Sequence, residues 1–356
     1  MHLNGSIKVT PDIPAKPWKK ATLPKRILAI RLQAMGDLVI TLPYLQQLKR
    51  ALPAGTRLDL LTREEVDTIP KSIELFDKVY SIRGGRNVKK QLLYASSLVP
   101  KLLFQRYDVV IDLQNNITSR LVRKTLMPKA WSSFDRFSAI AAGESNRLTI
   151  EAIGLGSCFP DHDFKIINDS SHNCLKQNGW DGISELVVLN PAGAFITRNW
   201  PIENFIGFAK LWLEQFPKTQ FVIIGVNTIA EKATYLKQIL GNKLIDLVNK
   251  TIPAQAFALI QKMRFVLSED SGLMHMAWVS GIPTLAMFGS TTAYRATPLG
   301  DHTLLLHSSD LACGNCMKET CTYGDTHCLT RYSPEFVFEK AMELMATEPI
   351  QELIKV

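Results

Sequence analysis

A group of polar and small residues interrupts an apolar stretch between Leu267 and His275 (Leu-Ser-Glu-Asp-Ser-Gly-Leu-Met-His). The pattern predicts a buried strand that ends here and a helix that begins at the Ser271–Gly272 turn. The free backbone N–H groups and the positive dipole end of such a helix suit a phosphate anion. Ser271 can offer a hydroxyl, Gly272 lets a ligand approach the backbone, and His275 lies one turn into the helix. An ordinary helix capped by Asp270 or Ser271 would carry the same residues.

A second candidate loop runs from Asn190 to Pro201 (Asn-Pro-Ala-Gly-Ala-Phe-Ile-Thr-Arg-Asn-Trp-Pro). It also joins a predicted strand to a predicted helix, and ligands collect at that edge of an open α/β sheet. Gly193 and Ala194 would leave room for a ligand. Thr197 and Arg198 would offer a hydroxyl and a cation to a diphosphate. The alternative is a surface loop with a solvated arginine.

A third candidate is Asp37, which follows Gln-Ala-Met-Gly at the start of a predicted helix. Gly36 permits a tight turn after the preceding strand. Aspartate is a favoured helix N-cap, so a purely structural role explains the residue. The functional alternative is general base catalysis, in which the carboxylate removes a proton from an attacking hydroxyl group.

Four of the six cysteines lie close together near the C-terminus, at Cys313, Cys316, Cys321 and Cys328. Four thiolates could hold a structural Zn²⁺ ion or an iron–sulfur cluster, but these intervals match no standard ligand spacing. Free thiols and disulfides are the alternatives. The predicted cytoplasmic setting disfavours disulfides.

Apolar segments of strand and helix type alternate along the chain, which predicts an α/β fold with two doubly wound parallel sheets. We expect an N-terminal tail (1–25), a first Rossmann-like domain (26–170), a second (183–330), and a C-terminal segment (331–356) whose helix packs back towards the first domain. The polar stretch 160–182 is the predicted linker. Predicted strands are 26–32, 58–62, 78–82, 108–113, 185–190, 220–226, 264–270 and 284–288, and predicted helices include 91–106, 229–240, 253–263, 272–280 and 333–346.

The 356 residues carry a formal net charge of +8. This charge suits either solubility or an acidic partner. Nucleic acid is disfavoured because the basic residues are scattered and no nucleic-acid module is recognisable. No apolar run approaches the roughly 20 residues that span a bilayer, and the N-terminus lacks the apolar core of a secretory signal. We therefore expect a cytoplasmic protein.

Three motifs together resemble glycosyltransferase family 9, the bacterial lipopolysaccharide heptosyltransferases. They are Arg26–Pro43 (RILAIRLQAMGDLVITLP), Asn190–Ala194 with Arg198–Pro201, and Asp270–His275 with Gly281–Gly289. The resemblance implies a GT-B fold, in which two Rossmann-like domains face each other across a cleft. It also implies an inverting, metal-independent transfer of heptose from ADP-L-glycero-D-manno-heptose to a Kdo or heptose acceptor in the lipopolysaccharide inner core.

The resemblance assigns Asp37 as the catalytic base and places Arg198 where the family usually has a lysine that neutralises the diphosphate. An arginine keeps this charge but changes its reach and geometry. Other residues implied to bind the donor are Gly193, Ala194, Thr197, Glu231, Thr251, Asp270, Ser271, Gly272, Leu273 and His275, with Glu231 and Thr251 matched only loosely. Weaker acceptor candidates are Arg63, Gln114, Asn115 and Arg120.

The implied partners are the nucleotide-sugar donor and a lipid A–linked core oligosaccharide, with peripheral contact at the cytoplasmic face of the inner membrane. No cofactor is expected to be required. One alternative is a GT-B enzyme with another nucleotide-sugar donor or a protein acceptor. The other is a non-catalytic scaffold that binds a nucleotide or a metal ion.

Overall fold

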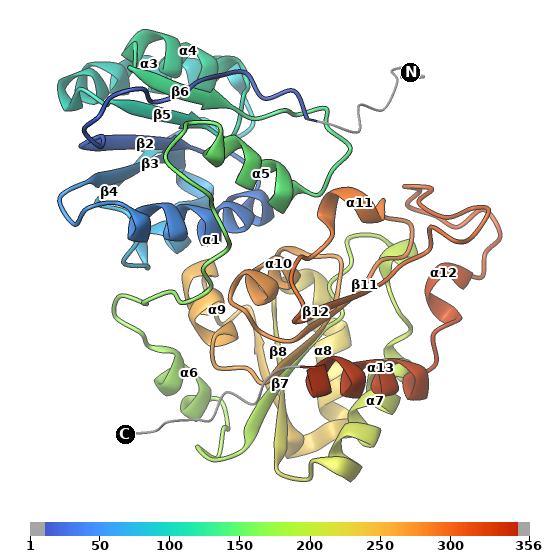
Figure 1. Cartoon of the computed structure of the whole chain (residues 1–356). Helices are drawn as coiled ribbons and strands as arrows, with labels where there is room; N and C mark the ends of the chain where they lie inside the picture. The colour runs from blue at the N-terminus through green and yellow to red at the C-terminus, as the bar shows by residue number, and fades with distance from the viewer. Residues whose placement is uncertain (1–10, 348–356) are drawn as a thin grey trace. The chain divides into compact units, whose positions relative to one another are not determined.

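The computed structural model describes residues 11–347 and divides into two units, the first ending at Asn168 and the second beginning at Asp169. Each unit contains a six-stranded sheet with helices packed against it (Figure 1). The predicted class, two doubly wound α/β domains, is confirmed. No helix within residues 11–347 is long and apolar enough to cross a membrane.

The sheet of the first unit has the order β1-β6-β5-β2-β3-β4. All neighbouring strands are parallel except the short edge strand β1, which runs antiparallel to β6. The strand order reverses between β2 and β5, which is where open α/β sheets bind their ligands. The strands are β1 (Ala15–Lys16), β2 (Arg26–Ile30), β3 (Arg57–Arg63), β4 (Lys78–Ile82), β5 (Val109–Asp112) and β6 (Ala130–Ser133).

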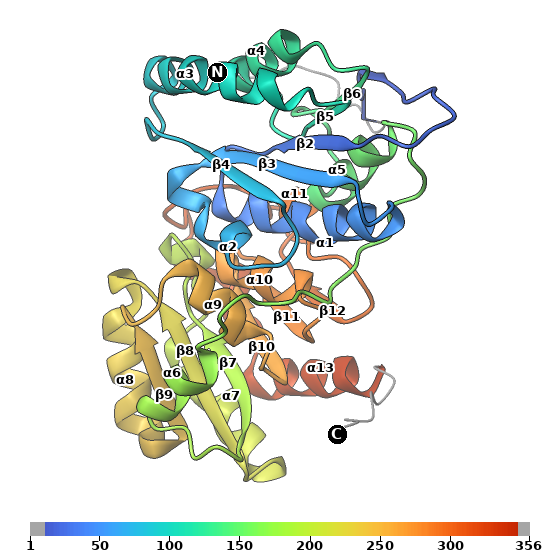
Figure 2. The ribbon, with the colours of Figure 1, turned by 90° about the vertical axis from the view of Figure 1, so that its left-hand side faces the viewer.

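Helices cover both faces of this sheet, with α3 and α4 on one face and α1 and α5 on the other (Figure 2). The apolar sides of α3 and α4 meet Leu28, Ile30 and Leu61 of the sheet in one buried cluster. The α-helices of this unit are α1 (Met35–Ala51), α2 (Thr68–Lys71), α3 (Val88–Gln105), α4 (Ile117–Leu126) and α5 (Ala142–Glu151).

The sheet of the second unit is entirely parallel, with the order β12-β11-β10-β7-β8-β9. In chain order this is the doubly wound 3-2-1-4-5-6 arrangement, and the order reverses between β7 and β10. The strands are β7 (Glu185–Asn190), β8 (Thr219–Gly225), β9 (Leu244–Val248), β10 (Phe265–Glu269), β11 (Thr284–Met287) and β12 (Thr303–Leu306).

The last helix, α13, packs in the second unit, contrary to the expectation that it would pack towards the first domain. Its apolar residues Val337, Ala341 and Leu344 complete the core of the second unit beside α7. Phe338 adds an edge-on contact with Phe208 of α7, and this packing accounts for the helix's position. The α-helices are α6 (Ser171–Gln177), α7 (Ile202–Gln215), α8 (Ala230–Leu240), α9 (Pro253–Ile260), α10 (Gly272–Val279), α11 (Ala293–Ala296), α12 (His327–Thr330) and α13 (Pro334–Thr347).

Candidate functional site

The two predicted donor segments leave the same edge of the second sheet. β7 and β10 are parallel neighbours, and Asn190 at the end of β7 lies opposite Ser268 of β10. The loop 191–201 and the turn at Asp270–Ser271 therefore begin side by side at the switch point. Two segments that are distant in sequence thus form one candidate site.

Ser271 caps α10, so of the two predicted caps the structure selects the serine. Its backbone is extended, and its hydroxyl accepts a hydrogen bond from the N–H of Met274 at 3.3 Å. The Asn190 amide donates to both Ser268 Oγ and Ser271 Oγ at 2.7 Å. Gly272 has open space where a Cβ would project. The Asn190 amide therefore supports the N-terminus of α10, and the space beside Gly272 is open.

Arg198 is not a solvated surface residue, because its guanidinium group has defined partners. Its Nη1 donates to Asp270 Oδ2 at 3.1 Å, and only 15% of its side chain is exposed. Asp270 Oδ2 also accepts a hydrogen bond from the Thr291 hydroxyl at 2.8 Å. The guanidinium carbon lies 4.8 Å from the centroid of the Phe195 ring. These contacts place the cation next to the Ser271 turn.

Glu269 is fully buried at the end of β10 and holds the donor loop through its backbone. Its two carboxylate oxygens accept hydrogen bonds from the N–H groups of Gly193 and Trp200, each at 2.6 Å. Burial raises the pKa of Glu269 to about 7, against the opposing effects of Lys232 and these two N–H groups. Glu269 lies within the predicted donor segment, but no individual role was predicted for it.

Lys232 of α8 supports the same loop from its other side. Its ammonium group lies 4.0 Å from Glu269 Oε2, donates to Pro191 O at 2.8 Å, and also donates to the side chain of Asn199. Burial lowers the pKa of Lys232, and the charge of Glu269 opposes that shift. Both ends of the loop are thus held by one carboxylate and one ammonium group.

Two residues of the donor loop have roles that differ from those predicted. A Cβ on Gly193 would lie 2.3 Å from Arg198 O, so the glycine makes room for the loop's own backbone and not for a ligand. The Thr197 hydroxyl is buried, donates to Lys318 O at 2.5 Å and lies 2.9 Å from Ser290 Oγ. It is therefore used inside the protein and is not offered to a diphosphate.

The other donor candidates lie at the same edge with different exposure. His275 is buried, and its Nδ1 accepts a hydrogen bond from the Trp278 indole N–H at 3.1 Å. Leu273 is half-buried in the first turn of α10, and Ala194 is exposed in the loop. Glu231 is exposed in the first turn of α8, and Thr251 is half-buried just after β9.

In the first unit, Asp37 lies in the first turn of α1 and is not its N-cap. Ala34 occupies the cap position, and its N–H donates to Asp37 Oδ2 at 2.8 Å. Arg31 Nη2 lies 3.0 Å from Asp37 Oδ1, and the aspartate side chain is 43% exposed. One carboxylate thus satisfies a free N–H group of the helix, pairs with a buried arginine and remains accessible.

The acceptor candidates differ in how they are engaged. Gln114 Oε1 accepts hydrogen bonds from the N–H groups of Leu32 and Gln33, at 2.9 and 3.0 Å, and so supports the turn before Asp37. Arg63 is buried and donates to Gly85 O at 2.8 Å.

The remaining two acceptor candidates follow β5. Asn115 donates to Phe134 O at 2.7 Å, whereas Arg120 is exposed on α4. Gln114 is thus the acceptor candidate whose hydrogen bonds lead most directly to the Asp37 turn.

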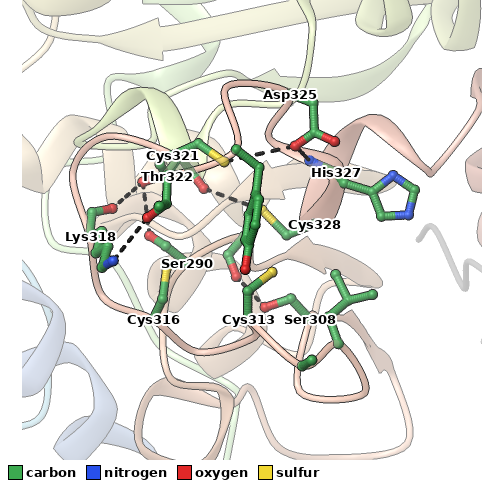
Figure 3. Close-up of a pocket in the computed structure, with 15 residues that line it drawn as sticks. Ser290, Ser308, Cys313, Cys316, Lys318, Cys321, Thr322, Asp325, His327 and Cys328 are labelled. Atoms are coloured by element: carbon green, nitrogen blue, oxygen red, sulfur yellow. Dashed lines mark hydrogen bonds between the residues drawn. The ribbon is translucent and has the colours of Figure 1, made fainter.

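The four C-terminal cysteines line one cavity of about 450 Å³, each as a free thiol (Figure 3). Within residues 11–347, no three His, Cys, Asp or Glu side chains are arranged to hold a metal ion. A structural metal, free thiols and disulfides were the alternatives for these cysteines, and in the structure all four are free thiols. Cys328 faces Thr197 O, and Cys321 faces Asp325.

The thiols in this cavity differ electrostatically. Backbone N–H groups of Thr326 and Tyr323 lower the pKa of Cys321. Burial, together with the nearby Cys321 and Cys316 thiols, raises the pKa of Cys328. The cavity also touches the donor loop at Thr197.

Comparison with known proteins agrees with this geometry. The sequence model for "Glycosyltransferase family 9 (heptosyltransferase)" matches residues 144–327, just over half of the chain, including the donor loop and the Ser271 turn. The chain belongs to glycosyltransferase family 9. Several heptosyltransferases resemble this family 9 chain, some in sequence and some in solved structure.

Lipooligosaccharide heptosyltransferase 2 of Campylobacter jejuni is 28% identical over 166 residues, which cover 45% of this chain and 51% of the relative. The chain thus spans about half the length of that relative. Lipopolysaccharide heptosyltransferase 1 of Pseudomonas aeruginosa is 24% identical, with 91% of this chain and 99% of the relative covered. The Escherichia coli heptosyltransferase WaaC, solved with ADP-2-deoxy-2-fluoro heptose, has a TM-score of 0.63 at 19% identity and covers 89% of this chain and 99% of its own. This likeness supports the GT-B fold.

Proposed function

We propose that this family 9 chain transfers heptose from an ADP-heptose donor to the inner core of lipopolysaccharide. The observation that carries the proposal is the pairing of Arg198 with Asp270 beside the Ser271 cap of α10. The arrangement combines a cation with free backbone N–H groups at a sheet switch point, which suits a nucleotide diphosphate. The names of the relatives, all heptosyltransferases, supply the sugar.

The chemistry follows from charge development. Displacing ADP from the anomeric carbon builds negative charge on the leaving phosphates, which preorganised cations and N–H dipoles stabilise. In this proposal Arg198 and the N-terminus of α10 supply that stabilisation from the protein itself, so the reaction proceeds without a catalytic metal ion. Asp37 accepts the proton of the attacking sugar hydroxyl. Direct attack by that hydroxyl inverts the anomeric configuration.

Glu231 and Thr251 remain candidates for the nucleoside because both follow strands at this edge of the sheet. Gln114 and Arg63 remain candidates for the acceptor. A lipid A–linked acceptor also implies peripheral contact with the inner membrane surface.

A donor and acceptor screen tests this proposal. Release of nucleoside diphosphate is followed with ADP-heptose, UDP-glucose and GDP-mannose, each with a Kdo-terminated and a heptose-terminated core acceptor. We expect ADP-heptose to be the preferred donor and Asp37→Ala to remove the acceptor-dependent rate. Turnover of UDP-glucose or GDP-mannose in preference to ADP-heptose would overturn the donor assignment. Sugar transfer to a protein and to neither core acceptor would instead favour the protein-modifying alternative.

A further inference from the structure

The two helices on one face of the first sheet present an unusual outer surface. α3 and α4 pack against each other, and their inner sides are buried with the sheet (Figures 1 and 2). Because both helices lie on the same face, their solvent-exposed sides point away from the sheet together. No described element of the first unit covers that exposed side, as the exposure of its residues shows.

Large apolar side chains project from this surface. Leu93 and Phe104 of α3 are 69% and 82% exposed. They are eleven residues apart, or about three helical turns, and therefore lie on one line of the helix. Ile117 and Leu121 of α4 are one turn apart, and both are exposed, as is Met127 at the C-cap of α4. Isolated exposed apolar residues are ordinary, but an apolar row on each of two adjacent helices marks an interaction site.

The charge around these rows has one sign. The segments 83–107 and 113–134 contain no aspartate or glutamate but contain ten lysines and arginines. On α3, Lys90 and Lys101 are also eleven residues apart and are exposed beside the Leu93–Phe104 row. On α4, the exposed Lys124 follows Leu121 by three residues, on the same side of the helix. Three of the ten cations, Arg83, Arg123 and Lys129, pair with carboxylates outside the two segments. Among the described residues, Lys90, Lys101 and Lys124 beside the apolar rows form no ion pair with a carboxylate.

We propose that this α3–α4 face, defined by Leu93, Phe104, Ile117, Leu121 and Met127 with Lys90, Lys101 and Lys124, docks on an anionic lipid surface. The apolar tips enter the headgroup region, and the lysines bind lipid phosphates. A second copy of the chain is a poorer occupant, because a twofold contact would set this cationic face against itself. The inference rests on the proposed function, since a lipid A–linked acceptor lies in such a surface.

Vesicle flotation of the full chain tests the docking surface directly. We expect binding to vesicles that contain phosphatidylglycerol, weaker binding to phosphatidylcholine alone, and loss of the difference at high salt. The double variant Leu93→Ser/Phe104→Ser should bind anionic vesicles about tenfold more weakly, because two large apolar groups no longer leave water. Lys90→Glu/Lys101→Glu should lose the preference for anionic lipid.

A matched control replaces an exposed aliphatic and an exposed aromatic residue elsewhere. Ile183 and Phe159 are 85% and 70% exposed and lie outside α3 and α4, so Ile183→Ser/Phe159→Ser should bind vesicles as the wild type does. Equal binding by wild type and Leu93→Ser/Phe104→Ser would overturn the proposal. The proposal would also be overturned if light scattering showed that the Leu93→Ser/Phe104→Ser variant changes from dimer to monomer while its vesicle binding stays the same. The face would then be a contact between copies of the chain.

An activity measurement separates this proposal from the proposed function. With a deacylated, water-soluble acceptor, the Leu93→Ser/Phe104→Ser variant should release ADP at the wild-type rate. With the acceptor embedded in vesicles, it should be slower by about the same tenfold factor as its binding. If neither protein transfers heptose to any core acceptor, the proposed function fails while the flotation result still decides the docking surface.

Discussion

Glu269 Oε2 accepts a hydrogen bond from the backbone N–H of Gly193 at 2.6 Å, across 76 residues of sequence. The other carboxylate oxygen accepts from the N–H of Trp200, at the far end of the same loop. Arg198 lies between these two attachment points. A buried carboxylate therefore sets the backbone that carries the cation proposed to face the diphosphate, and Glu269 acts as a positioning residue.

Glu269→Gln should weaken donor binding more than it slows the chemical step. The amide oxygen can replace one carboxylate oxygen, but its NH₂ group cannot accept from the second backbone N–H group. Loss of one such hydrogen bond corresponds to a rise in donor KM of about fivefold, with kcat changed less. Steady-state kinetics of ADP release measure both constants.

The pH dependence distinguishes this positioning role from a general loss of packing. Since the pKa of Glu269 is about 7, the wild-type donor KM should fall as pH rises through 7 and the carboxylate ionises. The Gln variant should lack this change. The matched control is Glu185→Gln. Glu185 lies at the start of the neighbouring strand β7 and pairs with Arg264. This variant should keep the wild-type dependence of donor KM on pH. An identical profile in Glu269→Gln would contradict the assignment.

The same group should make the stability of the protein depend on pH. An unfolded glutamate loses its proton near pH 4.5, whereas Glu269 keeps its proton until about pH 7. Between these values the folded state binds more protons, so the free energy of unfolding falls as pH rises, by about 3 kcal/mol in total. Denaturant unfolding of wild type and Glu269→Gln at several pH values measures the difference. A difference that stays constant from pH 4.5 to pH 7 would show that Glu269 has an ordinary pKa.

Much of the fold could be predicted from sequence because its central strands are apolar runs. The strand at 185–190 (Glu-Leu-Val-Val-Leu-Asn) was predicted with the bounds that the structure gives. By contrast, the edge strand β12 (Thr303–Leu306) was not predicted, and only one of its four residues is buried, whereas all four residues of β11 are. The position of α13 also could not be predicted, because an apolar helix face does not say which core it completes.

The candidate site shows a similar division. Ser271 was predicted as a cap because capping is local and depends on residues three apart. No individual role was predicted for Glu269 or Lys232, because their partners, the backbone and side-chain groups of the loop 191–201, are brought to them only by the folded sheet. Glu269 could have been recognised as an ionisable residue at the end of an otherwise apolar strand. A carboxylate buried at such a position needs polar partners that are buried with it.

Replacement of Asp37 should separate its chemical role from its structural one. Asp37→Asn can still accept the hydrogen bond from the Ala34 N–H but cannot take a proton, so kcat should fall about 10²- to 10⁴-fold with little loss of stability. Asp37→Ala should lose kcat equally and also about 1 kcal/mol of unfolding free energy. Acceptor-dependent ADP release and thermal unfolding measure the two effects. Wild-type turnover in either variant would exclude Asp37 as the base.

Arg198 provides a test of how much of the donor site depends on charge and how much on geometry. Arg198→Met removes the cation and should lower kcat/KM about 10²- to 10³-fold, as expected for loss of a group that stabilises a leaving anion. Arg198→Lys keeps the positive charge but loses the planar guanidinium geometry. Its kcat/KM should therefore be only about tenfold below the wild-type value.

The control for Arg198 is Arg264, which pairs with Glu185 and stacks on Phe216 at the other end of β7. Arg264→Met should leave kcat/KM near the wild-type value. Equal losses in Arg198→Met and Arg264→Met would mean that the effect comes from altered folding and not from the diphosphate site.

The cysteines around the cavity in Figure 3 should react with iodoacetamide in a defined order. Cys321 should react at lower pH than an ordinary thiol, because backbone N–H groups stabilise its thiolate. Cys328 should react last of the four, since burial and the neighbouring thiols oppose its ionisation. Mass spectrometry of the alkylated peptides across a pH series gives the order, and Cys158, buried in the first unit with a pKa raised to about 12, serves as the unreactive reference. Reaction of Cys328 before Cys321 would show that the loop 313–328 adopts another arrangement in solution.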